Sequence, residues 1–70
     1  MSTNQKYSVR IHTRRQLVST VTHLQNASKS LAQIGTRYEN ALPRVSLACD
    51  EMIKMLSMVE ALVEDIRENI

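Results

Sequence analysis

This 70-residue chain has no Trp or Phe, one Gly, one Pro and one Cys, and a formal net charge of only +2. That composition excludes an aromatic core, an internal disulfide and a turn-rich β architecture, and the charge is low for a nucleic-acid-binding protein. A single core of this size is marginally stable, so we expect other chains to supply the missing burial.

The first twelve residues are polar and basic. "MSTNQK" is typical of a disordered start and does not resemble a secretion signal, which would need an apolar segment. Residues 7–11 then alternate apolar and polar side chains, which fits either a short strand or an extended basic arm. We favour a flexible basic arm over residues 1–12. The candidate contacts to phosphate groups or to an acidic partner, in this arm and just after it, are Lys6, Arg10, Arg14 and Arg15.

A helix is predicted to begin at Thr13, because "TRRQ" fits a capping box with Gln16 reaching back to the first amide. We take Leu17 as position a of a seven-residue repeat labelled a to g. Every a position is then apolar or aromatic over eight heptads, and most d positions, which begin at Thr20, are apolar. Such a repeat is typical of a coiled coil, so residues 13–70 are predicted to be an all-α assembly region. The residues expected to bind partner helices are Leu17, Val21, Leu24, Leu31, Ile34, Tyr38, Val45, Met52, Met55, Leu56, Val59, Leu62, Val63 and Ile66.

Pro43 leaves two architectures open. A proline inside a helix costs about 3 kcal/mol, and Gly35 could end a helix before it, which would give an antiparallel helical hairpin. The heptad phase nevertheless continues across Pro43, which itself falls at an outward position. We therefore favour one long coiled-coil helix, straight or kinked, with the hairpin as the alternative. From Leu42 onward the e positions are also apolar, which widens the apolar face and predicts a multi-helix bundle.

No catalytic or metal-binding constellation is recognisable. Cys49 lies in an apolar stripe and is expected to be a buried, inert thiol, and His12 and His23 lack the spacing of metal ligands. We expect no enzymatic activity, no cofactor and no metal. No apolar run approaches the roughly 18 residues of a transmembrane helix. A lone cysteine favours a cytoplasmic location, with the nucleus also compatible.

The charges are divided unevenly along the chain. Residues 1–38 carry six Lys and Arg and no acid, whereas residues 39–70 carry seven acids and three bases. Such a chain is complementary to itself when antiparallel, and equally to a partner of the opposite polarity.

The segment "LAQIGTRYENALPRV", residues 31–45, resembles one family of short helical proteins. These are subunits of the biogenesis of lysosome-related organelles complex and of the related lysosome-positioning complex. The resemblance is carried by Leu31, Ile34, Arg37, Tyr38, Ala41, Pro43 and Val45. It implies long helices that assemble side by side into rod-like hetero-oligomers concerned with endolysosomal trafficking.

Together these features predict a non-enzymatic helical subunit that assembles with other helical chains as a scaffold or adaptor component. A hetero-complex is favoured. The alternatives are a self-assembling homo-oligomeric helical regulator and, less favoured, a nucleic-acid-binding regulator that uses the basic residues 6–15.

Overall fold

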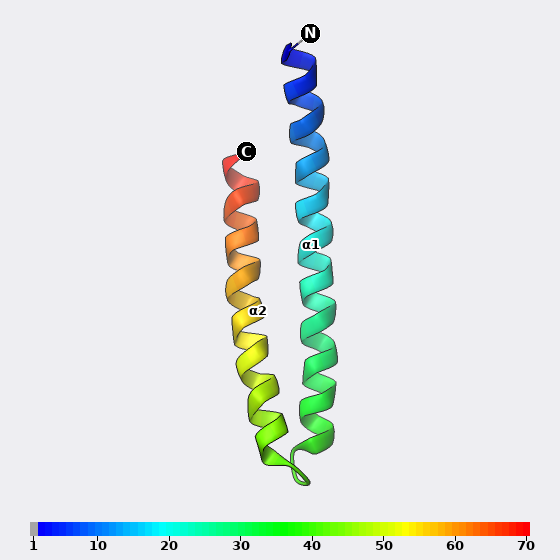
Figure 1. Ribbon diagram of the computed structural model, residues 1–70, viewed down its shortest axis with the longest axis vertical. Helices are drawn as coiled ribbons and strands as arrows, with labels where there is room; N and C mark the ends of the chain where they lie inside the picture. The colour runs from blue at the N-terminus through cyan, green and yellow to red at the C-terminus, as the bar shows by residue number, and fades with distance from the viewer. Residues whose placement is uncertain (1) are drawn as a thin grey trace.

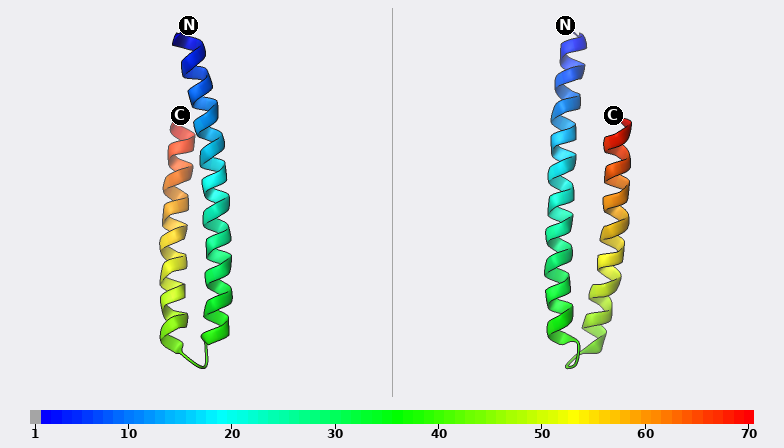
Figure 2. Two further views of the ribbon diagram at one scale, coloured as in Figure 1. Left: turned by 45° about the vertical axis from the view of Figure 1, so that its right-hand side comes forward. Right: turned by 180° about the vertical axis from the view of Figure 1, so that it is seen from behind.

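The protein is a helical hairpin. The computed structural model describes residues 2–70, which form two helices, α1 (Ser2–Tyr38) and α2 (Pro43–Asn69), joined by a four-residue turn. The helices run antiparallel and lie side by side in every view (Figures 1 and 2). The resulting rod measures 61 × 15 × 11 Å. The described residues contain no strand, so the all-α prediction is confirmed.

Pro43 begins a helix and does not interrupt one. As the first residue of α2 it has no amide hydrogen to donate, but a helix needs none at that position, and the fixed φ of proline is already helical. Leu42, directly before it, has φ −140° and ψ 81°, outside the helical region that a following proline disfavours. The Leu42 amide donates to the Tyr38 carbonyl at 2.9 Å, which closes the turn. The favoured single long helix is therefore wrong, and the hairpin alternative is confirmed.

Gly35 brings the two helices together just before the turn. It does not end α1, which continues to Tyr38, and no residue described has a positive φ. Instead it is buried, and a Cβ placed on it would lie 3.3 Å from the Cβ of Cys49 on α2. The absence of a side chain at this position therefore permits close packing, whereas the sequence had suggested a helix C-cap.

The N-terminal segment is helical as well. Helix α1 already includes residues 2–12, so neither the short strand nor the helix start at Thr13 is observed. The Thr13 hydroxyl donates to the Val9 carbonyl at 2.8 Å, the bond of a residue within a helix and not of an N-cap. With no Pro or Gly before Gly35, nothing in the sequence interrupts the helix. The N-terminal end of α1 projects past the C-terminal end of α2 (Figure 1).

The helices meet along a narrow line that we call the seam. On α1 it follows Val21, Ser28 and Gly35, and on α2 it follows Cys49, Leu56 and Val63, each set spaced by seven residues. Cys49 is 2% exposed and Val63 is 8% exposed, and they are the only apolar residues counted as buried in the part of the chain described. The hairpin therefore has almost no core of its own.

Candidate interaction surface

The most prominent surface feature is an apolar stripe on α2 that the hairpin leaves uncovered. Its residues occupy successive a and d positions, so they form one continuous line along the helix. The stripe consists of Met52, Met55, Val59, Leu62 and Ile66. Their exposed fractions run from 41% at Met52 to 63% at Leu62. The e positions Cys49, Leu56 and Val63 are buried or half-buried against α1, whereas the a and d positions from Met52 to Ile66 are exposed.

Helix α1 extends this stripe across the seam. Ala27 and Leu31 join Met52, Met55, Leu56 and Val59 around a shallow hollow of about 360 Å³. None of these six side chains carries a charge or a hydrogen-bonding group stronger than a thioether. Thr20 and Ala27 are d positions of α1 and are exposed, whereas Leu31 is half-buried. We call the α2 stripe together with Thr20 and Ala27 the open face.

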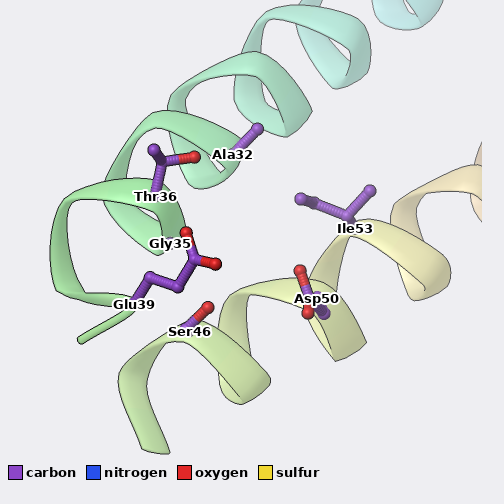
Figure 3. A pocket seen from close by; sticks show the side chains of 7 residues that line it. All are labelled: Ala32, Gly35, Thr36, Glu39, Ser46, Asp50 and Ile53. Carbon is purple, nitrogen blue, oxygen red and sulfur yellow. The ribbon is translucent and has the colours of Figure 1, made fainter. Parts of the chain in front are cut away.

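The opposite side of the hairpin is polar. Leu31 and Ala32 are about 100° apart around α1, so they flank the seam on different sides, as do Met52 and Ile53 on α2. Ala32 and Ile53 belong to a second hollow, of about 250 Å³. Its other lining residues are Gly35, Thr36, Glu39, Ser46 and Asp50. Figure 3 shows oxygen-bearing side chains of both helices around this hollow.

A polar hollow with two carboxylates is a solvated surface unless it holds a cation. In the part of the chain that the structure describes, no three His, Cys, Asp or Glu residues come together as a metal site would require. The hairpin therefore has one apolar side and one water-facing side. Covering the apolar side with another molecule lowers the free energy through the hydrophobic effect, whereas covering the water-facing side brings no such gain.

A third feature is a basic cluster at the end of the hairpin farthest from the turn. Arg14, Arg15 and Val18 of α1 and Arg67 of α2 line a hollow of about 330 Å³. Arg67 is ion-paired with Glu64, with 3.3 Å between Nη2 and Oε2. The sequence had suggested Arg14 and Arg15, whose side chains are exposed as that role requires. It gave no sign of Arg67, because only the antiparallel fold brings the end of the chain back to them.

The residues expected to bind partners fall into two groups. Eight are buried or half-buried in the hairpin itself: Leu17, Val21, Leu24, Leu31, Ile34, Val45, Leu56 and Val63. Six are exposed: Tyr38, Met52, Met55, Val59, Leu62 and Ile66. Among the basic candidates, Arg10 is exposed on α1, and the side chain of Lys6 lies outside the described residues. Partner binding by any of these residues remains a prediction.

Comparison with known proteins gives no relative: no family model matches the chain, and neither a curated protein nor a solved structure matches it significantly. The resemblance of residues 31–45 to lysosome-related organelle subunits thus remains a prediction. Within residues 2–70, neither helix combines the length and the apolar character that crossing a membrane requires.

Proposed function

We propose that this chain is a non-enzymatic assembly subunit, a scaffold or adaptor component that lays its open face against the helices of another polypeptide in the cytoplasm. One observation carries the proposal. The a and d side chains of α2 from Met52 to Ile66 are exposed, although the sequence repeats them as a coiled-coil core would.

The amount of uncovered surface supports an assembling role. The chain exposes 5723 Å², whereas a compact 8.0 kDa monomer would expose about 4,450 Å² by the usual scaling of surface with mass. The excess of about 1,300 Å² exceeds the roughly 800 Å² that each partner buries in a typical stable interface.

The energetics point the same way. Fully burying a Leu, Ile, Met or Val side chain is worth about 1.5–3 kcal/mol. The five α2 residues of the open face are already partly covered, so covering the rest contributes about 1 kcal/mol each. A two-helix hairpin with almost no core is marginal alone. Binding and stable folding are therefore coupled.

The shape of the open face fits a helix as its partner. Its residues follow the spacing of three and four that presents one side of a helix to a second helix. Two methionines, Met52 and Met55, line the hollow beside Ala27, and their flexible side chains adapt to the partner's surface.

The resemblance of residues 31–45 makes endolysosomal trafficking the first pathway in which to test this subunit. The turn at residues 39–42 falls within the resembling segment, so the chain lacks the single long helix that the resemblance implies. A hairpin can still serve as a subunit of a helical rod, because its long axis is parallel to both helices (Figure 2).

The test compares two substitutions on α2 in the tagged chain expressed in its native cells. Leu62→Glu places a charge on the open face, and Leu47→Glu places the same charge at a site 65% exposed and off that face. We expect Leu62→Glu to lose the helical partners recovered with the wild-type chain, and Leu47→Glu to keep them. Recovery of the same partners at wild-type yield with Leu62→Glu would show that the open face is not the binding surface.

A second candidate function is supported by the basic cluster of Arg14, Arg15 and Arg67, which could contact the phosphates of a nucleic acid. The small net charge and the pairing of Arg67 with Glu64 make this the weaker candidate. Fluorescence anisotropy with labelled duplex DNA at physiological salt tests it, and no measurable affinity for DNA eliminates it.

A further inference from the structure

We propose that the partner on the open face is a second copy of this chain. The two hairpins would form a four-helix bundle with both turns at the same end and with α1 of each copy beside α2 of the other. This inference rests on the proposed function, that the open face binds helices, and it specifies the partner and its orientation.

Symmetry leaves two ways to pair the open faces of two hairpins. A two-fold axis parallel to the helices puts both turns at one end and sets α1 beside the partner's α2. A two-fold axis perpendicular to the helices puts the turns at opposite ends and sets α1 beside the partner's α1. The charges and the side-chain sizes of the two helices distinguish these arrangements.

The charges favour turns at the same end. Helix α1 carries six Lys and Arg and no acid, whereas α2 carries six Asp and Glu against three Lys and Arg. Setting α1 beside the partner's α2 brings a basic helix to an acidic one. Setting α1 beside the partner's α1 brings two wholly basic helices together, which is repulsive.

Side-chain size favours the same arrangement. The exposed α2 residues of the open face are large, whereas the exposed α1 residues, Thr20 and Ala27, are small. The large α1 residues beside them, Leu24 and Leu31, are half-buried against α2. The Thr20 hydroxyl already donates to the Gln16 carbonyl at 2.9 Å, so covering Thr20 leaves no donor unpaired. Large residues of one copy therefore pack onto small residues of the other, as interdigitating cores require. The opposite arrangement sets large residues against large ones and small against small.

The levels of these residues along the rod also match. Gly35 is level with Cys49 at the close approach, and each residue of a helix rises about 1.5 Å. A bundle with its turns at the same end keeps those levels between copies. Ala27 of one copy then lies midway between the partner's Met55 and Val59, and Thr20 lies midway between the partner's Leu62 and Ile66. This is the knobs-into-holes relation of packed helices.

The first test is the mass of the purified full-length chain by sedimentation equilibrium. We expect a dimer of about twice the 8.0 kDa chain mass at micromolar concentration. We expect Leu62→Glu to weaken the dimer at least about 100-fold, because it buries a charge, and Leu47→Glu to leave it unchanged. A monomer at 100 µM, or an oligomer other than a dimer, overturns the inference.

The second test measures orientation. A spin label on Asn40→Cys, in the turn, is introduced together with Cys49→Ala, and the distance between the two labels of a dimer is measured by pulsed electron paramagnetic resonance. A distance below about 25 Å supports turns at one end, whereas a separation near the length of α2, about 40 Å, overturns that arrangement.

The dependence of association on salt gives the same information on the unmodified chain. Raising NaCl from 50 to 500 mM screens charges between the copies. If α1 lies beside the partner's acidic α2, the dissociation constant rises with salt. If α1 lies beside the partner's α1, the dissociation constant falls with salt, and the proposed orientation is overturned.

These outcomes are separate from the test of the proposed function. A purified chain that is monomeric, but whose capture of partners in cells is abolished by Leu62→Glu, overturns the second copy as partner and leaves the assembly role standing. Capture that Leu62→Glu does not affect overturns the assembly role of the open face.

Discussion

On α2 the residues of the seam and those of the open face lie next to each other, are similar in kind and have opposite environments. Cys49, Leu56 and Val63 are buried or half-buried against α1, while Met52 and Leu62, one to three residues away, are exposed. The heptad pattern supplies more apolar positions than a two-helix hairpin can cover. The surplus positions are the ones that the proposed assembly would cover.

The sharpest way to test this contrast is to place the same charge at two neighbouring residues, Val63 and Leu62. Val63→Glu puts a carboxylate at a position 8% exposed, whereas Leu62 is 63% exposed. Burying an unpaired charge costs more than about 3 kcal/mol, which exceeds what a marginal hairpin can lose. We expect Val63→Glu to lose most of its helical circular dichroism, and Leu62→Glu to retain clearly more at the same concentration. Equal loss from both would show that the seam and the open face are not distinct.

A smaller effect is expected from widening the seam at Gly35. Gly35→Leu would force α1 away from Cys49, whose Cβ already lies 3.3 Å from the position of a Cβ on residue 35. Overpacking of this kind costs about 1–3 kcal/mol, and a thermal melt followed by circular dichroism measures it. The control is Gly35→Ala, in which a better helix propensity offsets the tight contact. A Leu variant as stable as wild type would contradict the close approach.

The smallest effect is expected at the turn. Pro43→Ala removes a residue that restricts the unfolded chain, at a helix position that suits proline, and should lower stability by about 0.5–1 kcal/mol. Small-angle scattering checks the architecture. A hairpin keeps a longest dimension near 61 Å, whereas a continuous helix of the whole chain would reach about 100 Å. A rise toward the larger value would mean that Pro43 is required for the turn.

Much of the fold follows from the sequence, and the exceptions have physical causes. The heptads and the scarcity of Gly and Pro correctly predicted an all-α chain. The hairpin was only the alternative because the apolar phase after Pro43 matches the phase before it, which hid a four-residue interruption. The cost of a proline in mid-helix was the better guide, because Pro43 avoids that cost by starting α2. Residues 2–12 were assigned to an arm because apolar and polar residues alternate over residues 7–11, a pattern typical of a strand or an extended segment and not of a helix.

The open face was only partly predictable. The apolar stripe widens after Leu42, and the structure covers its e positions with α1 while the a and d positions from Met52 to Ile66 stay exposed. That these exposed positions bind a partner stays a prediction. Which apolar positions the hairpin would cover depends on the rotation of α2 about its own axis. That rotation is defined by the contact of Gly35 with Cys49, two residues on different helices whose proximity no local pattern reveals. The cluster of Arg67 with Arg14 and Arg15 was hidden for the same reason.

The burial of Cys49 has a practical consequence. It is the only thiol in the chain, it is 2% exposed, and it lies against Gly35 of α1. A thiol reagent can therefore reach its sulfur only while the helices are apart, so the rate of labelling reports how often the hairpin opens. If assembly stabilises the hairpin, that rate falls as the protein concentration rises. Labelling of the unmodified chain at several protein concentrations thus tests whether folding and association are coupled.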